Sequence, residues 1–299
     1  MESEKWDLKT IRRGRSIVSF LGLSCGDALG ERFFRPKNPT DRVTRTLPEG
    51  PWIYTDDTAM AISIVRILRD HGTIKQDELA TAFALSYKEN PNRGYGPAAH
   101  GILEQLLYRD WREVAQKPFD GQGSCGNGSA MRVAPVGAYF SDDYATCVEE
   151  AAKSAAPTHA HPEAKAGAIA IAIAAAFACR LAEGAVKKHE FFKTVIDHTP
   201  ESVVRDGVIK ASSLPPSTEI FQAVKILGNG RKVMCQDTVP YAIWCAERNL
   251  FDYEEGVWNA IACRGDIDTM AAIVGGIVVN SSKTGIPAAW IERREALNV

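Results

Sequence analysis

The chain has 299 residues with nearly balanced charge, 35 Lys and Arg against 37 Asp and Glu, for a formal net charge of −2. This balance offers no broad basic surface for nucleic acid or an anionic membrane. Seven cysteines with no C-x-x-C pair argue against a zinc knuckle or a disulfide framework, so we expect reduced, mostly buried thiols. The acidic start, Met1 to Asp7, lacks the basic and apolar parts of a signal peptide, so we expect a cytoplasmic protein.

Helical periodicity dominates the chain, and strand-like alternation is scarce. In chain order the sequence predicts helices over Ile11–Leu23, Thr58–Asp70, Gln76–Tyr87, Pro97–Tyr108, Tyr144–Ser154, Ala166–Cys179, Phe191–His198, Glu219–Leu227, Val239–Ala246, Glu255–Cys263 and Met270–Val279. The Ala166–Cys179 run is shorter than the roughly 20 residues of a membrane span and apolar all round, which predicts a central core helix. The predicted fold class is all-α, as a single domain over residues 1–299, monomeric and without membrane contact.

Three glycines at four-residue spacing, Gly22, Gly26 and Gly30, begin at the end of the first predicted helix and continue beyond it. On a helix this spacing forms a smooth stripe that permits close contact with a second helix. Packing explains the glycines but not the acidic Asp27 among them, which we keep as a candidate site residue.

Two short acidic segments, Thr55-Asp56-Asp57-Thr58 and Asp266-Ile267-Asp268-Thr269, each lead into a predicted buried helix. Either segment alone would be an ordinary helix cap, because carboxylates are favoured at a helix N-terminus. Together they supply only hard oxygen ligands, which Mg²⁺ or Mn²⁺ prefers. A fold that joins the two helix starts would build a dinuclear site from Thr55, Asp56, Asp57, Asp266, Asp268 and Thr269.

A glycine-rich segment, Gly126-Asn127-Gly128-Ser129, can turn backbone N–H groups toward an anion. A helix could then open over Ser129–Arg132. The alternative is a plain flexible turn, and no G-x-x-x-x-G-K-[ST] motif indicates a triphosphate loop.

His159 and His161 stand two residues apart just before the alanine-rich helix. An H-x-H pair can bind zinc, but no second histidine cluster or cysteine pair accompanies it. The more ordinary interpretation is a hydrogen-bonding element near a helix start.

The ordered series Gly26-Asp27-Ala28-Leu29-Gly30, Thr55-Asp56-Asp57-Thr58, Gly126-Asn127-Gly128, Thr158-His159-Ala160-His161-Pro162 and Gly265-Asp266-Ile267-Asp268-Thr269 resembles the ADP-ribosylglycohydrolase family. The resemblance spans roughly residues 20 to 287. It implies a compact all-α domain around two Mg²⁺ or Mn²⁺ ions that hydrolyses the bond between ADP-ribose and an acceptor. The two acidic segments match the metal-binding motifs. The glycine segment (Gly126, Asn127, Gly128, Ser129), Asp27, His159 and His161 match the ADP-ribose cleft.

Two positions depart from the family pattern. Many members carry a glutamate seven residues after the first aspartate, where this chain has Phe34 and its nearest acid is Glu31. The last motif has Arg264 in place of a glycine and Ile267 in place of a threonine. Neither change removes a matched carboxylate, but the first affects the expected gating and the class of acceptor.

Hydrolysis at the ribosyl carbon requires an oriented ribose, a delivered water and an assisted leaving group. Asp56 or Asp57 is the candidate base, and the sequence leaves that choice open. The expected partner is an ADP-ribosylated protein or small molecule, and a nucleic-acid substrate is not excluded. Three alternative interpretations are a zinc hydrolase using the histidine pair, a serine acylase, and a non-catalytic ADP-ribose binder. The acylase lacks its S-x-x-K motif, and the intact aspartates argue against the binder.

Overall fold

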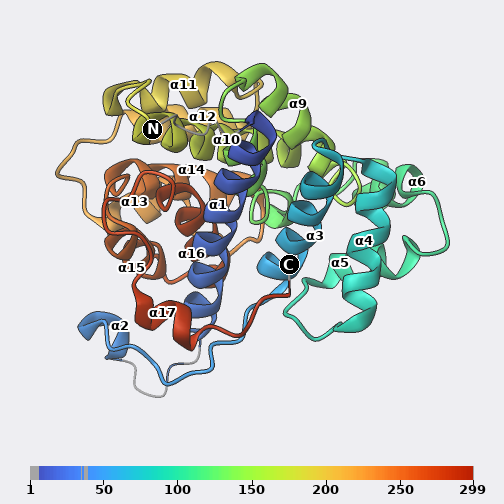
Figure 1. Cartoon of the computed structure of the whole chain (residues 1–299), viewed down its shortest axis with the longest axis horizontal. Helices are drawn as coiled ribbons and strands as arrows, with labels where there is room; N and C mark the ends of the chain where they lie inside the picture. The colour runs from blue at the N-terminus through green and yellow to red at the C-terminus, as the bar shows by residue number, and fades with distance from the viewer. Residues whose placement is uncertain (1–6, 35, 37–39, 299) are drawn as a thin grey trace, which may run out of the picture.

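The computed structural model describes residues 7–34, 36 and 40–298, and it is built almost wholly from helices (Figure 1). Within these residues the only β-type pairing is two isolated bridges, Trp52 with Arg294 and Gly126 with Met234. The helices are α1 (Leu8–Glu31), α2 (Asp41–Thr44), α3 (Asp56–His71), α4 (Gln76–Glu89), α5 (Pro97–Gln105), α6 (Trp111–Gln116), α7 (Pro118–Gly121), η1 (Asn127–Ser129), α8 (Ala134–Tyr139), α9 (Tyr144–Ala155), α10 (Pro162–Ala182), η2 (Lys188–Glu190), α11 (Phe191–His198), α12 (Val203–Ser212), α13 (Ile220–Leu227), α14 (Cys235–Arg248), α15 (Tyr253–Ile261), α16 (Ile267–Val278) and α17 (Ala288–Arg293). The predicted all-α class is confirmed.

Helix α10 is the central helix of the core. Every residue from Ala166 to Cys179 is buried, and α8, α9, α11 and α14 pack around the helix. Its length and apolar composition alone would let it cross a membrane, but 83% of its most apolar stretch is buried inside the molecule. Because it is apolar on all faces, it is stable only when neighbours cover every face. The prediction of a central core helix is confirmed.

Helices α1 and α16 lie side by side through the middle of the molecule (Figure 1), with their backbones in direct contact at several glycines. A Cβ on Gly26 would lie 2.1 Å from the backbone oxygen of Ala271, and a Cβ on Gly22 would lie 2.5 Å from that of Gly275. Glycine is therefore required along this stripe, because any side chain would push the backbones apart. The predicted helix contact is confirmed, and α1 continues through the stripe to Glu31.

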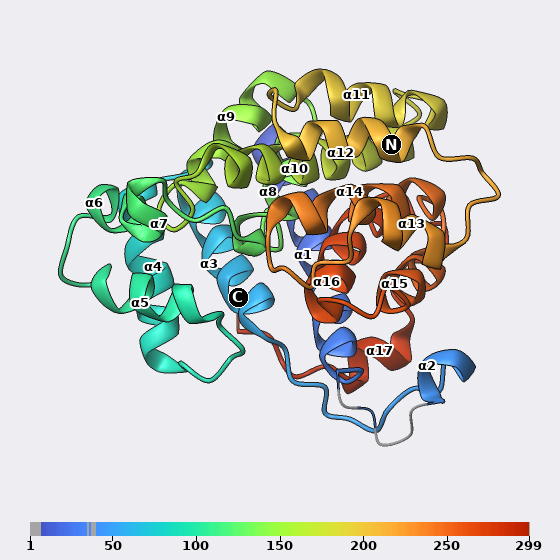
Figure 2. The same ribbon diagram turned by 180° about the vertical axis from the view of Figure 1, so that it is seen from behind.

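The remaining helices flank this centre. Helices α4, α5 and α6 gather on the outer side of α3, whereas α13 and α15 lie on the opposite side of α1 and α16 (Figures 1 and 2). The C-terminal segment returns to α3, where the Arg66 side chain donates to the backbone oxygen of Asn298 at 2.7 Å. The C-terminal segment thus reaches the second half of α3.

Several elements differ from the sequence predictions. Short helices such as α6, α8 and α17, of six residues each, carry too few turns to show a clear apolar period, and they were not predicted. Helix α12 was not predicted either. The helix expected to open over Ser129–Arg132 is wrong: a single 3₁₀ turn ends at Ser129, and α8 begins only at Ala134. Pro135 explains the later start, because proline suits the first helical turn and disfavours helix before it.

Two further expectations concern the chain ends and the thiols. Residues 1–6, used in the argument against a signal peptide, lie outside the described residues. All seven cysteines are free, and six of them are buried, with only Cys125 partly exposed. The expectation of reduced, mostly buried thiols is confirmed. The single-domain organisation stays a prediction.

Candidate metal centre and substrate cleft

The two acidic segments form the starts of helices α3 and α16. Thr55 and Asp266 occupy the N-cap positions, yet neither side chain makes a capping hydrogen bond. Asp57 and Asp268 both stand second in their helices. The carboxylates are therefore available for something other than ordinary capping, while the positive end of each helix dipole favours their charge.

Three carboxylates from three helices converge at this point. Asp27 of α1, Asp57 of α3 and Asp268 of α16 each place one oxygen within 4.8 Å of the other two, and we call these three residues the acidic cluster. The glycine stripe makes this approach possible, because a Cβ on Gly30 would lie only 2.7 Å from Cα of Asp268. Close contact of α1 with α16 thus brings Asp27 to the start of the other two helices.

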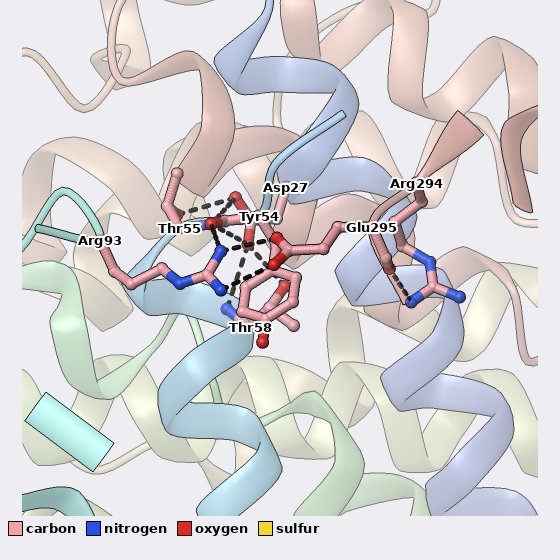
Figure 3. Close-up of polar contacts among 7 residues, drawn as sticks. All are labelled: Asp27, Tyr54, Thr55, Thr58, Arg93, Arg294 and Glu295. Atoms are coloured by element: carbon pink, nitrogen blue, oxygen red, sulfur yellow. Dashed lines mark hydrogen bonds and ion pairs between the residues drawn. The ribbon is translucent and has the colours of Figure 1, made fainter. Parts of the chain in front are cut away.

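Asp27 is fully buried and also organises the first acidic segment. It accepts hydrogen bonds from the backbone N–H of Thr55 at 3.0 Å and of Thr58 at 3.1 Å, and the hydroxyls of both threonines bond to it as well (Figure 3). The Thr55 hydroxyl also lies 3.0 Å from Oδ2 of Asp57. These bonds fix the first turn of α3 against α1.

Arg93 holds the same segment from the other side. Its guanidinium lies 3.9 Å from the centre of the Tyr54 ring, donates to the Tyr54 backbone oxygen at 2.9 Å, and pairs with both carboxylate oxygens of Glu295 (Figure 3). The backbone oxygen of Arg93 in turn accepts from the N–H of Asp56 at 2.7 Å. The C-terminal segment is anchored here too, because the N–H of Glu295 donates to the backbone oxygen of Trp52 at 2.8 Å.

The glycine loop lies against the second acidic segment. The side-chain amide of Asn127 donates to Oδ2 of Asp266 at 2.7 Å and to the Thr238 hydroxyl at 3.0 Å. Gly126 and Gly128 are partly exposed, whereas Asn127 and Ser129 are buried. The loop therefore presents partly exposed glycine backbone and is anchored by the buried side chains of Asn127 and Ser129.

The two histidines are held differently. His159 is nearly buried, with its ring against the glycine loop: a Cβ on Gly128 would lie 2.9 Å from its Nε2. His161 is the N-cap of α10, and its Nδ1 accepts from the N–H of Glu163 at 3.1 Å. Among the described residues neither histidine belongs to a group that could hold a metal ion. The zinc alternative therefore has no geometric support.

The comparison with known proteins agrees with this geometry. A family model described as ADP-ribosylglycohydrolase matches residues 8–298, nearly the whole chain. The chain belongs to the ADP-ribosylglycohydrolase family. The predicted family and the hydrolase class are thereby confirmed.

Individual relatives are similar over most of this chain. They include ADP-ribosylhydrolase ARH3 of Homo sapiens, which is 30% identical over an alignment that covers 92% of this chain and 89% of the human protein. ARH3 of Gallus gallus is 30% identical over 97% of this chain and 85% of its own. ADP-ribosyl-[dinitrogen reductase] glycohydrolase of Rhodospirillum rubrum is 30% identical over 41% of this chain and 43% of its own. A solved structure described as an ADP-ribosylglycohydrolase-related protein complex has a TM-score of 0.61 at 24% identity, covering 96% of this chain and 94% of the other, which supports the fold.

The electrostatics of this glycohydrolase site call for a cation. Burial, followed by the charge of Asp27, raises the pKa of Asp57 well above its ordinary range, and burial and Asp57 do the same for Asp268. Burial also raises the pKa of Asp27, against which its hydrogen bonds to the threonines act. Oδ1 of Asp57 is buried without any hydrogen-bond partner. A buried acidic oxygen without a partner is costly, and a divalent cation would satisfy it.

Asp56 differs from its neighbour Asp57. Its side chain is partly exposed, and burial together with the charge of Asp27 raises the pKa of Asp56 to about 7. The two adjacent acids therefore differ in their surroundings: Asp57 belongs to the acidic cluster, and Asp56 is partly exposed.

The predicted site residues are therefore brought together around the starts of α3 and α16. Thr55 and Asp57 contact the acidic cluster or belong to it, Asp266 is joined to the glycine loop, and the N–H of Thr269 donates to Oδ1 of Asp268 at 2.7 Å. Asp27 was expected in the substrate cleft, whereas the structure places it inside the acidic cluster. Residue spacing does not predict this position, because Asp27 lies far from both acidic segments along the chain and reaches them through the packing of α1 on α16. The roles of individual residues stay predictions.

Phe34, where the sequence departs from the family pattern, lines a cavity that is separate from the acidic cluster. A cavity of about 870 Å³ is lined by Glu31, Phe34, Leu47 and Ile53 among others, and none of the acidic cluster lines it. Phe34 is 40% exposed there. Where many relatives carry a glutamate, this chain therefore presents an apolar ring to the cavity.

Proposed function

We propose that the acidic cluster holds divalent metal ions, Mg²⁺ or Mn²⁺, and that the protein uses them to hydrolyse the glycosidic bond between ADP-ribose and an acceptor. Family membership supports hydrolysis of ADP-ribose linkages. The observation that carries the metal assignment is the convergence of Asp27, Asp57 and Asp268 with a buried, unpaired oxygen on Asp57. An all-oxygen donor set of this kind suits these two ions better than zinc.

The residues around the cluster complete the proposed ligand set. Thr55, Asp266 and Thr269 lie in the same two segments as Asp57 and Asp268, so two ions can share them. When bound, such ions orient ribose hydroxyls and lower the pKa of a coordinated water. The dinuclear count rests on the number of oxygen donors in the two segments.

Asp56 is the proposed base. Its partly exposed carboxylate can meet a water molecule in the cleft, whereas buried Asp57 is committed to the cluster. A group that accepts a proton near neutral pH is suited to general base catalysis. Arg93 and Glu295 keep Asp56 in place through the backbone bond to Arg93.

The glycine loop is the proposed diphosphate site. Gly126 and Gly128 leave backbone accessible, and no cationic side chain is needed to bind an anion by N–H groups. Asn127 and Ser129 anchor the loop, His159 borders it, and His161 caps the helix that follows. This arrangement would set the ribose between the diphosphate and the acidic cluster.

The acceptor is a protein or a small molecule that carries ADP-ribose, and the relatives' names point to ADP-ribosylated substrates. A nucleic-acid end is a further candidate. We also infer a reducing compartment such as the cytoplasm, supported by the free thiols, and a monomeric state. The non-catalytic alternative receives no support from the comparisons or from the intact aspartates.

The test is release of free ADP-ribose from ADP-ribosylated arginine, serine and DNA-end substrates. We expect release with Mg²⁺ or Mn²⁺ and none in chelator, and loss of release in Asp268→Asn. Glu254→Gln is the matched control, because Glu254 is an exposed acid in the first turn of α15. Metal-independent release, or equal loss in both variants, would contradict the proposal.

A further inference from the structure

Arg132 is a fully buried cation, and within the described part of the chain no carboxylate forms a hydrogen bond with it. Its guanidinium stacks 4.3 Å from the centre of the Phe83 ring and donates to the Met60 sulfur at 3.3 Å and the Ser154 backbone oxygen at 3.1 Å. The charge of Asp56 acts on Arg132 without a hydrogen bond between them, and a buried charge without a bonded counter-charge is expensive. The third hydrogen bond of this side chain is therefore of interest.

The remaining bond runs to the hydroxyl of Thr158, at 2.8 Å from Nη2 of Arg132. The same hydroxyl oxygen lies 2.7 Å from Nδ1 of His159. A guanidinium can only donate, so the threonine oxygen accepts from Arg132. The hydroxyl hydrogen is then left for His159, the only acceptor bonded to it in the described part of the chain. Nδ1 of His159 therefore accepts a hydrogen bond.

A neutral imidazole carries one proton, and an accepting Nδ1 places that proton on Nε2. Nε2 lies on the ring edge that meets the glycine loop: it lies 3.3 Å from the Cβ position of Gly126 and 2.9 Å from that of Gly128, beside Cε1 at 2.8 Å from the latter. The absence of side chains at these two glycines leaves the room that the imidazole edge occupies.

We propose that Arg132 and Thr158 are positioning residues that hold His159 as the Nε2–H tautomer, so that it donates a hydrogen bond to the diphosphate or ribose oxygen of ADP-ribose at the glycine loop. This inference deepens the proposed function and rests on it for the identity of the ligand. The tautomer itself follows from the three side chains alone.

The surroundings keep His159 neutral. Burial, reinforced by the charge of Arg132, lowers the pKa of His159 to about 3. Burial also lowers the pKa of Arg132, to about 9, which still leaves it charged near neutral pH. A neutral donor with a fixed tautomer gives the cleft a directed hydrogen bond that does not depend on protonation of the ring.

Thr158 offers a matched pair of variants. Thr158→Val replaces the hydroxyl by a methyl group of similar size, and Thr158→Ser retains the hydroxyl. Arg132→Lys retains a charge and a donor, but truncation of a fully buried arginine can unfold the protein. The threonine pair therefore carries the test, and thermal unfolding of both variants checks that the fold survives.

The first readout is the nitrogen spectrum of the histidine rings in the Mg²⁺-loaded full-length protein, with the His159 signals assigned by their loss in His159→Gln. We expect the parent and Thr158→Ser to show a protonated Nε2 and an unprotonated Nδ1. Thr158→Val should lose this pattern in favour of a mixture of tautomers. A proton on Nδ1 in the parent, or an unchanged pattern in folded Thr158→Val, would overturn the inference.

The second readout is calorimetric binding of ADP-ribose to the same proteins. Loss of one directed hydrogen bond should weaken binding to Thr158→Val by about threefold to tenfold, with Thr158→Ser within about twofold of the parent. Equal binding by all three proteins would overturn the positioning role. If the parent itself bound no ADP-ribose, the proposed function would fall and the ligand would be wrong, whereas the spectrum would still decide the tautomer.

Discussion

The contact between α1 and α16 can be tested with one methyl group. In Gly26→Ala the added Cβ would lie 2.1 Å from the backbone oxygen of Ala271 and 2.7 Å from its carbonyl carbon. Nonbonded heavy atoms settle at about 3.5 Å, so the two helices would have to separate. Backbone cannot rotate away as a flexible side chain can. Because Asp27 is the next residue, the displacement would also move one carboxylate of the acidic cluster.

The expected magnitude follows from two opposing effects. Overpacking of a core costs about 1–3 kcal/mol, and the better helix propensity of alanine returns about 1 kcal/mol. With a rigid backbone clash at the upper end of that range, we expect a net loss of about 2 kcal/mol in the free energy of unfolding. At about 2–3 °C per kcal/mol for a chain of this size, the melting temperature should fall by about 4–6 °C.

Gly14→Ala is the matched control on the same helix. Gly14 is exposed, and a Cβ there would meet nothing within 4 Å. Only the propensity gain remains, so this variant should be stabilised by about 0.5–1 kcal/mol. Thermal unfolding of both variants, followed by circular dichroism, measures the difference. A Gly26→Ala protein that melts at or above the parent temperature would refute the close packing of α1 on α16.

Four further outcomes are expected. Asp57→Asn should reduce Mg²⁺ affinity and hydrolysis by at least about a hundredfold, since it alters a proposed direct ligand. Metal titration and ADP-ribose release measure these two quantities. Near-normal values would mean that the acidic segments are only helix caps. In chelator the protein should lose stability as pH rises from about 4 to about 7. Burial and the charge of Asp27 raise the pKa of Asp56 from 3.8 to about 7 in the folded state. Between these two pH values the folded state therefore binds a proton that the unfolded state releases, so its stability falls as pH rises. Added Mg²⁺ should therefore raise the melting temperature more at pH 8 than at pH 5, and the opposite trend would contradict this sign. Glu295→Gln should weaken Mg²⁺ binding by about threefold, because a partly exposed ion pair with Arg93 is worth about 0.5–1 kcal/mol. Gly128→Val should weaken ADP-ribose binding much more than Mg²⁺ binding in paired titrations. The new side chain would collide with His159 and would also obstruct the loop. An ADP-ribose affinity equal to that of the parent protein would show that the loop is not part of the site.

The helical fold and its central helix were predictable because their signals are local. The apolar run from Ala166 to Cys179 and the glycine spacing from Gly22 to Gly30 are visible in the sequence, and each leads directly to a packing statement. The short helices α6, α8 and α17 were missed because one or two turns give no reliable period. Their formation depends on the neighbours against which they pack.

The site was predictable only in part. The two acidic segments stand out because they supply the oxygen ligands that Mg²⁺ and Mn²⁺ prefer. The contribution of Asp27 to the acidic cluster is not visible in the sequence, because Asp27 is distant from both segments along the chain. Arg93 and Glu295 were not indicated at all, since an ion pair between residues 202 positions apart leaves no local pattern. Likewise Arg132 lies just after the glycine segment in the sequence, but its hydrogen bond to Thr158 is visible only in the structure.

Three helices bring carboxylates together, and we propose that these carboxylates hold divalent ions. Anomalous diffraction from crystals soaked in Mn²⁺ would locate such ions. We expect manganese peaks between Asp27, Asp57 and Asp268, at about 2.1 Å from carboxylate oxygens. Peaks at His159 and His161 instead, or no peak at the starts of α3 and α16 in crystals of protein that is active with Mn²⁺, would contradict this proposal.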